Sequence, residues 1–322
     1  MVEKMKYRHT FEAKEDRIQD LYDGLIYQSL RNTFVSIGDI QQPYKYFSSE
    51  TDIALGIATD GFAPFRKRKQ TCWPILVYNL NLPPDLRFLM DYLICAGVVP
   101  GPKKPKDFDS FLYPFVSECL ELAAGVKAYH CLQQCAFLLR AYPVFASGDM
   151  PAMAMIMLMK GHNAICPCRM CKIIAILRRG TTTYYVPLQA PAGHPGRAVP
   201  TYNPKSLPLR NHDDFLEDAQ HVQLAPSQAE SNRRAKDSGV KGFPILAHVN
   251  SLIFPHLFPF DFMHLLYENL IKNLLDFFCG QFKELEHGDE GYCVEQALWE
   301  AIGDATEESG ATIPGAYGAR PR

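Results

Sequence analysis

The sequence predicts an α/β fold, because three segments with strand character precede the first stretch of helical periodicity. Residues 52–59, 72–81 and 88–99 are the strand candidates, and turn residues follow them: Asp60-Gly61, Pro83-Pro84 and Pro100-Gly101-Pro102. Three strands in succession with turn-like links indicate an antiparallel meander. Between residues 108 and 123 the apolar residues then recur every three to four positions, which predicts an amphipathic helix capped by Asp107 or Asp109.

A fourth strand candidate and further helices complete the expected order. Residues 137–147 form an apolar run that ends at Gly148-Asp149, and residues 150–160 are expected to be helical, with Pro151 in the first turn. Helices are also expected within 17–31, 211–239 and 261–278. Residues 243–260 are apolar and are interpreted as one more strand with its approach, although they contain three prolines.

Composition and charge restrict the class of protein. The chain has 322 residues, 47% hydrophobic and 21% charged, which is typical of one large or two ordinary globular domains and excludes wholesale disorder or a coiled-coil rod. A net charge of −2 argues against a wholly basic nucleic-acid binder but leaves room for a local basic groove. The longest apolar runs are far shorter than the ~20 residues of a membrane span. Ten cysteines without a secretory signal predict reduced thiols in the cytosol or nucleus.

Two aspartates follow the first and fourth strand candidates. In a β-β-β-α-β-α order with a ribonuclease-H-like mixed sheet, the first and fourth strands are neighbours, so Asp60 and Asp149 would lie side by side. Paired carboxylates at strand ends bind Mg²⁺ or Mn²⁺ and support two-metal phosphoryl transfer. The alternative is structural: Asp60 as a turn residue and Asp149 as a helix N-cap.

A cluster of sulfur and imidazole ligands follows the second of these aspartates. Cys168-Arg-Met-Cys171 has the spacing of a zinc knuckle, and His162, Cys166 or a distant histidine would supply the remaining ligands for Zn²⁺. Unligated thiols are an open alternative. A redox pair is disfavoured because the thioredoxin context of a preceding strand is missing.

Three polar residues share one face of the helix expected over 261–278. Asp261, His264 and Glu268 occupy positions i, i+3 and i+7 on a helix otherwise rich in Phe, Leu and Ile. Such a face meets water, a metal or a partner. The alternative is a plain solvent-exposed face that Lys272 continues.

Two basic clusters follow strand candidates. They are Arg66, Lys67, Arg68 and Lys69 after the first strand, and Lys103, Lys104 and Lys106 after the third. Basic loops beside a carboxylate site could bind a phosphate backbone, and solvated loops are the alternative.

Taken together, six motifs in order resemble the transposases of CACTA (En/Spm-like) DNA transposons, in particular the type abundant in basidiomycete fungi. They are Thr-Asp-Gly-Phe-Ala-Pro-Phe from residue 59, Cys-Trp-Pro-Ile-Leu from 72, Gly-Pro-Lys-Lys-Pro-Lys-Asp-Phe-Asp from 101, Gly-Asp-Met-Pro-Ala from 148, Lys-Gly-His-Asn from 160 with Pro-Cys-Arg-Met-Cys from 167, and Asp-Phe-Met-His from 261 with Glu-Asn-Leu from 268. The resemblance implies a ribonuclease-H-like core with an Asp-Asp-Glu (DDE) metal triad. It also implies a nuclear protein that excises and transfers DNA, acting on transposon ends and target DNA.

The resemblance assigns roles residue by residue. Asp60 and Asp149 match the first two carboxylates, Cys168 and Cys171 match the family's Cys-x-x-Cys, and Asp261 and His264 match its Asp-x-x-His. A zinc site of Cys168, Cys171 and His264, with His162 as a further ligand, is inferred from these matches. The third carboxylate is expected on a helix after a long helical insertion, and Glu268 is the only substitute within this chain.

The resemblance also predicts a division of the chain into three parts. Residues 1–50 are expected to be an N-terminal extension, and 51–264 a transposase core with the zinc-knuckle region (160–171) and a proline-rich loop (180–210). Residues 265–322 are expected to be the start of a truncated helical insertion. A fragment of this kind is expected to be catalytically inactive. Its expected partners are DNA and further copies of itself in a homo-oligomer, and no membrane contact is expected. The alternatives are a non-catalytic, zinc-stabilised DNA- or protein-binding module, or a transposon relic without function.

Overall fold

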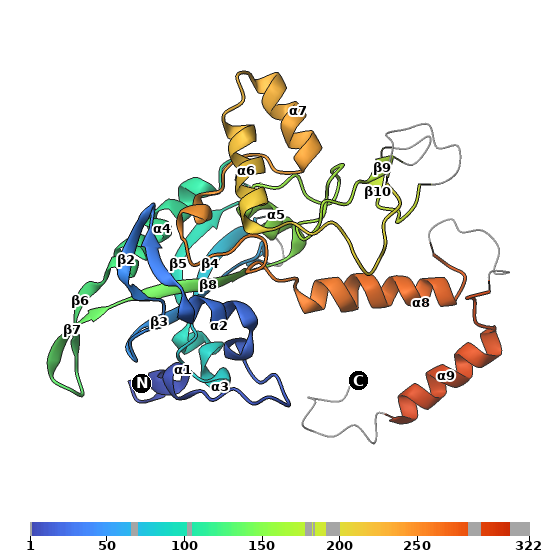
Figure 1. Ribbon diagram of the computed structural model, residues 1–322. Helices are drawn as coiled ribbons and strands as arrows, with labels where there is room; N and C mark the ends of the chain where they lie inside the picture. Colours follow the sequence, from blue (N-terminus) through green and yellow to red (C-terminus); the bar gives the residue numbers. More distant parts are fainter. Residues whose placement is uncertain are drawn as a thin grey trace. The chain divides into compact units, whose positions relative to one another are not determined.

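The computed structural model describes residues 2–65, 70–101, 105–177, 182, 184–190, 200–282 and 291–309. The chain divides into two compact units, Met1–Phe260 and Asp261–Arg322, which are treated separately below. The first unit is a mixed α/β structure built on a four-stranded sheet, which confirms the predicted fold class (Figure 1).

The central sheet has the strand order β5-β4-β3-β8. β3 (Ile53–Thr59), β4 (Cys72–Asn79) and β5 (Ile94–Pro100) form the predicted antiparallel meander, and β8 (Ala141–Ser147) pairs in parallel with β3. The first and fourth strands of the sheet are therefore neighbours, as the sequence predicted. β3 is almost entirely buried, in keeping with an apolar central strand covered on both faces.

One face of the sheet is covered by α4 (Asp109–Ala124), close to the helix predicted from periodicity. Leu112 and Val116 of α4 pack with Ile57 of β3 in the larger hydrophobic core. The N-cap residue is Phe108, which differs from the predicted Asp107 or Asp109, although the Asp107 carboxylate accepts the Ser110 N–H of the first turn at 3.2 Å. Helices α5 (Met150–Ile156), α6 (His212–Gln223) and α7 (Gln228–Ser238) lie beyond β8 along the chain, and α5 and α6 contribute to the same core.

Asp109 has a different role at the start of α4. Its Oδ2 atom accepts the Ile245 N–H at 3.0 Å, and burial raises the pKa of the carboxyl group to about 6 although that bond acts to lower it. A carboxyl group with a raised folded-state pKa reduces stability once it ionises, so its cost is absent below about pH 4 and complete above pH 6.

Replacing Asp109 by asparagine should therefore stabilise the protein at high pH. The amide oxygen keeps an acceptor for the Ile245 N–H and cannot ionise. We expect Asp109→Asn to raise the free energy of unfolding by about 1 kcal/mol at pH 8, a value discounted for the partial exposure of the group, and to have little effect at pH 4.5. Urea unfolding at the two pH values measures this, and an equal effect at both would contradict it.

The N-terminal segment covers part of the opposite face of the sheet. It contains α1 (Tyr7–Thr10), a single turn at Leu21–Asp23, α2 (Leu25–Asn32) and a hairpin of β1 (Phe34–Ile37) and β2 (Ile40–Lys45). Buried side chains of this segment form a second core with Ala54 of β3 and Tyr142 and Val144 of β8; they are Tyr22, Tyr27, Leu30, Val35, Tyr46 and Phe47. Residues 1–50 thus contribute more than half of the buried side chains of this core. The helix expected within 17–31 begins only at Leu25.

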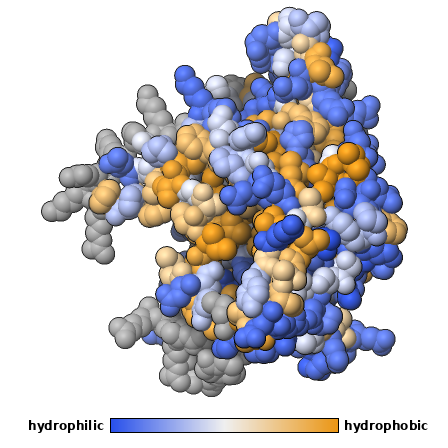
Figure 2. Space-filling view, turned by 90° about the vertical axis from the view of Figure 1, so that its left-hand side faces the viewer, coloured by the Kyte–Doolittle hydropathy of each residue, from blue (hydrophilic) through white to orange (hydrophobic). Residues whose placement is uncertain are grey.

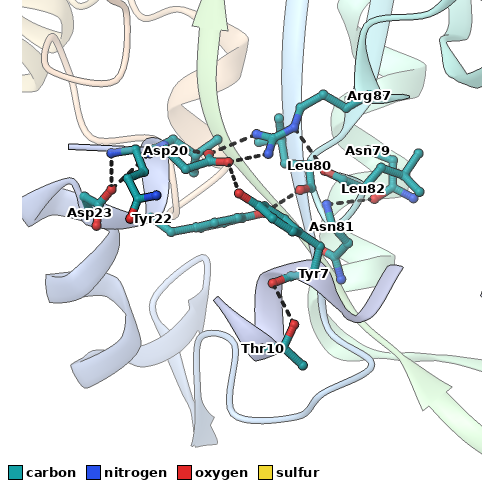
Figure 3. Close-up of polar contacts among 12 residues, drawn as sticks. Tyr7, Thr10, Asp20, Tyr22, Asp23, Asn79, Leu80, Asn81, Leu82 and Arg87 are labelled. Carbon is teal, nitrogen blue, oxygen red and sulfur yellow. Dashed lines mark hydrogen bonds and ion pairs between the residues drawn. The ribbon is translucent and has the colours of Figure 1, made fainter. Parts of the chain in front are cut away.

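A buried ion pair fixes the N-terminal segment to the chain that follows β4 (Figure 3). Arg87, in α3 (Pro84–Arg87), donates to both carboxylate oxygens of Asp20, and each side chain is 3% exposed. The Tyr7 hydroxyl donates to the same carboxylate at 2.9 Å, and the Tyr22 hydroxyl donates to the Leu80 carbonyl at 2.6 Å. Burial raises the pKa of Tyr7 to about 12, and its bond to Asp20 acts in the same direction.

Two expectations about strands are corrected by the structure. The apolar run 137–147 is two strands that separate at Arg140: β7 (Cys135–Leu139) pairs with β6 (Val126–His130) in a hairpin, and only β8 enters the central sheet. Residues 243–260 form no described strand but a helical turn at Ile245–His248 followed by irregular chain. Their apolar side chains still enter the core; they are Leu246, Val249, Leu252, Phe254 and Phe258. Prolines 244, 255 and 259 lack the N–H groups that a sheet ladder needs, so this segment packs through side chains.

The remaining elements are small or belong to the second unit. Within the proline-rich region, the described residues include a two-residue pairing of β9 (Ile176–Leu177) with β10 (Tyr184–Tyr185). The second unit contains η5 (Met263–Ile271), which continues as α8 (Lys272–Phe278), and α9 (Gln296–Ser309). Among the described helices, none combines the length and apolarity that crossing a membrane requires. Apolar side chains also reach the surface, among polar ones (Figure 2).

Candidate functional site

The parallel pairing of β3 with β8 brings Asp60 and Asp149 to one edge of the sheet. The last paired residues are Ala58 and Ser147, and each aspartate lies two positions further along the chain, just beyond the end of β3 or β8. Alternate residues of a strand point to the same face, and neighbouring strands lie about 4.8 Å apart. The two carboxylates therefore extend from adjacent strand ends on the same face of the sheet.

The backbone around Asp60 is held in an extended pairing rather than a free turn. The register that pairs Thr59 with Ile75 continues beyond Asp60, where Phe62 and Cys72 exchange two backbone hydrogen bonds of 3.1 and 2.9 Å. Gly61 lies between Asp60 and Phe62. A Cβ atom on Gly61 would come within 2.3 Å of the buried Trp73 indole nitrogen. The alternative interpretation of Asp60 as the start of a tight turn is therefore incorrect.

The backbone around Asp149 is fixed by two features. A Cβ atom on Gly148 would lie 2.4 Å from the Thr59 carbonyl oxygen, so glycine permits the close approach of the two strand ends. Asp149 is the N-cap of α5, because its Oδ1 atom accepts the Ala152 N–H at 2.6 Å. The capping alternative is thus confirmed, and it uses one oxygen of a group that has two.

This pair of carboxylates has the chemistry of a site for Mg²⁺ or Mn²⁺. Both ions prefer carboxylate oxygens and retain water or substrate oxygens as their other ligands. Asp60 is exposed and Asp149 is half-buried, so water and a phosphodiester can reach them from solvent. The donor set on this face therefore fits a hard cation.

Cys168 and Cys171 form a hydrogen-bonded pair of thiols in the first unit. The bond from the Cys171 thiol lowers the pKa of Cys168, helped by the Met170 N–H, which donates to Cys168 Sγ at 3.3 Å. The same contact, together with burial, raises the pKa of Cys171. Two neighbouring cysteine sulfurs suit a soft metal such as Zn²⁺, which binds cysteine as the thiolate.

Arg210 supports this pair, and sequence reasoning missed it. Its side chain is fully buried, and it donates to the Cys168 carbonyl at 3.2 Å and to the Ser238 carbonyl at 2.6 Å. The positive charge of this buried guanidinium acts to lower the pKa of Cys168, after the larger contributions of Cys171 and the Met170 N–H. No signal in the sequence marked this arginine, because it lies at the end of a polar, proline-rich stretch.

The other predicted ligands occupy separate positions. His162 is exposed and lines, with Cys168, a cavity of about 310 Å³. Cys166 is buried, and its thiol donates to the Asp237 carbonyl at 3.1 Å. Within the ranges that the structure describes, no group of three or more His, Cys, Asp or Glu side chains is arranged to hold a metal.

In the second unit, Asp261, His264 and Glu268 share one helix face, as predicted. His264 Nδ1 lies 3.0 Å from Asp261 Oδ2, and His264 Nε2 lies 4.0 Å from Glu268 Oε2. Asp261 also accepts the backbone N–H groups of Met263 and His264, so it begins the helix. The histidine is therefore oriented by an aspartate, an arrangement also found at metal-ligating and catalytic histidines.

Most of the basic residues predicted to contact phosphate lie outside the described residues. These are Arg66, Lys67, Arg68, Lys69, Lys103 and Lys104. Lys106 is described, and it is exposed in the loop between β5 and α4.

The region that carries the two aspartates matches a known protein family. Residues 36–190, slightly less than half of the chain, match the model of the transposase family tnp2. The matched segment includes the whole central sheet and Cys168 and Cys171, and it ends before Asp261 and His264. The match supports a chain derived from a transposase. No curated protein matches the chain.

Proposed function

We propose, from this similarity to a transposase family, that the chain is the core of a transposase of the CACTA type that cleaves and transfers DNA with divalent metal ions. The observation that carries the proposal is the parallel register of β3 and β8, since Asp60 and Asp149 each follow the last paired residue of their strand by two positions. The DDE assignment, the nuclear location and assembly as a homo-oligomer with transposon ends and target DNA are parts of the same proposal.

The roles of the residues follow from their positions. Asp60 and Asp149 would hold the metals, and bound Mg²⁺ would activate the attacking oxygen and stabilise the leaving oxygen of the phosphodiester. The ladder around Phe62 and the cap on α5 hold the two carboxylates in place before DNA binds. Lys106 and the neighbouring basic loops would bind the DNA backbone.

A third carboxylate is needed for full activity under this proposal. Glu268 is the candidate within the chain; it is 58% exposed, and its Oε2 atom lies 4.0 Å from His264 Nε2. We therefore expect the chain by itself to nick DNA weakly at most, which matches the proposal that this segment is inactive as an enzyme.

The test is Mn²⁺-dependent binding and nicking of DNA by three variants. Asp60→Asn and Asp149→Asn should each reduce metal-dependent nicking, or metal-dependent DNA binding where nicking is not detected, by on the order of 100-fold, since loss of metal-site partners has effects of this size. Asp39→Asn, in the exposed turn between β1 and β2, is the matched control and should match the wild type. Equal activity in all three variants would reject the proposal.

A second candidate function is a zinc-stabilised binding module without catalysis. The observation that favours it is the hydrogen-bonded pair of Cys168 and Cys171, whose backbone the buried Arg210 contacts at the Cys168 carbonyl. His162, which lines the same cavity as Cys168, is the proposed further ligand within this unit. We expect the purified chain to contain about one zinc per molecule by elemental analysis and Cys168→Ser to lose it. A zinc-free wild-type protein that unfolds cooperatively would rule out this module.

A further inference from the structure

We propose that Phe62 is a stacking platform for an unpaired nucleobase of the DNA bound at the Asp60–Asp149 edge. This inference rests on the proposed function and defines the state of its substrate: DNA whose bases are locally unpaired at the cleaved phosphate. It starts from the observation that the face of the sheet that carries Asp60 is apolar and open beside the carboxylates.

The position of Phe62 relative to Asp60 is set by the backbone. Phe62 lies two residues after Asp60 in the same extended pairing, so both side chains point to the same face. Two residues of strand span about 6.6 Å, a separation comparable to the reach of a nucleotide from its phosphate to its base. A metal-bound phosphate at Asp60 would therefore place its base near the ring of Phe62.

The surroundings of Phe62 make a flat apolar surface. In the register of β3 and β4, Pro74 of β4 lies opposite Asp60, and Pro74 is paired in turn with Val98 of β5. Phe62 is 50% exposed and Val98 is 56% exposed, although both belong to paired backbone. We call Phe62, Pro74 and Val98 the apolar apron.

Two features favour a nucleobase over a protein partner as the occupant. The apolar apron adjoins two carboxylates, which repel acidic surfaces unless a metal is bound, whereas a metal-bound phosphodiester brings its own flat apolar base to this place. The platform is also rigid, because the paired backbone and the packing of Gly61 on Trp73 fix it. Stacking on a rigid aromatic ring is the usual way in which proteins bind single-stranded nucleic acid without reading sequence.

The test uses the full chain and a short single-stranded DNA that contains 2-aminopurine, whose fluorescence falls when it stacks. Ca²⁺ replaces Mg²⁺ so that binding is measured without cleavage. We expect Phe62→Ala to weaken binding by about 5- to 100-fold and to abolish the quenching, because one base–aromatic stack has an effect of that size. Phe62→Trp should restore both. Tyr113→Ala is the matched control, since Tyr113 is 63% exposed on α4, which covers the other face, and it should bind like the wild type.

The outcomes separate the two proposals. Binding that depends on Asp60 but is equal in the wild type and Phe62→Ala, without quenching in either, would overturn the stacking role and leave the proposed function standing. Wild-type protein that binds no DNA at all would overturn both. Self-association lost in Phe62→Ala without any change in DNA binding would identify the apolar apron as a protein contact and would also overturn the stacking role.

Discussion

Replacing Asp20 by alanine should lower the free energy of unfolding by about 3–5 kcal/mol, because it leaves the buried Arg87 guanidinium without its partner. Arg87 is 3% exposed, and its other polar contact is to the Leu82 carbonyl at 3.0 Å. Tyr7 loses the acceptor of its hydroxyl in the same variant. An uncompensated buried charge and an unpaired buried donor both favour the unfolded state.

Denaturant unfolding measures this effect, and the neighbouring Asp16 provides the control. Asp16 pairs with Arg17 at 2.8 Å, but both side chains are more than half exposed, so Asp16→Ala should leave the free energy of unfolding close to that of the wild type. Similar small effects of the two variants would mean that residues 1–50 are not anchored to the sheet as described. A loss confined to Asp20→Ala would show that this segment belongs to the folding unit.

Replacing Gly148 by alanine should lower stability by about 3 kcal/mol and separate Asp60 from Asp149. The added Cβ atom would lie 2.4 Å from the Thr59 carbonyl oxygen, and a backbone atom cannot rotate away from the clash. The ends of β3 and β8 must then move apart. Inserting an extra carbon atom into a well-packed site usually lowers the free energy of unfolding by about 1–3 kcal/mol, and a clash with backbone belongs at the upper end of this range.

Gly97 is the matched control in the same sheet. A Cβ atom there would meet only the Ile75 side chain, at 3.9 Å, which is ordinary van der Waals contact. Gly97→Ala should therefore leave stability unchanged or raise it slightly, since alanine has less conformational freedom to lose. If urea unfolding gives the same free energy for both variants, the close approach of the two strands at Gly148 is wrong.

The sheet and its acidic edge could be predicted from sequence because local patterns specify them. Each strand of the meander is an apolar run that ends at Gly, Pro or Asp, and the period of α4 is clear over four turns. The order of the elements indicated a ribonuclease-H-like sheet, in which the first and fourth strands are neighbours. This strand order predicted that Asp60 and Asp149 lie close together. Asp149 could also be predicted as a cap, because Gly-Asp before a helix has a local signature.

The remaining features depend on contacts between residues far apart in the chain. The division of the run 137–147 at Arg140 is set by β6, whose pattern is too weak to show a hairpin by itself. Arg87 and Arg210 look like surface residues in the sequence, and only their distant partners explain their burial. Residues 243–260 are as apolar as a strand, but their prolines cannot donate the backbone hydrogen bonds of a sheet. The segment therefore enters the core as irregular chain.

The central claim is that Asp60 and Asp149 share a divalent cation, and calorimetric titration with Mn²⁺ tests it most directly. Asparagine keeps the α5 cap at residue 149 while it removes the charge, so Asp149→Asn should remain folded. If the two carboxylates hold one ion, Asp60→Asn, Asp149→Asn and the double variant should lose Mn²⁺ binding to about the same extent, since ligands that act as a unit are not additive. Mn²⁺ binding that survives in both single variants, or that disappears in Asp39→Asn as well, would contradict the shared site.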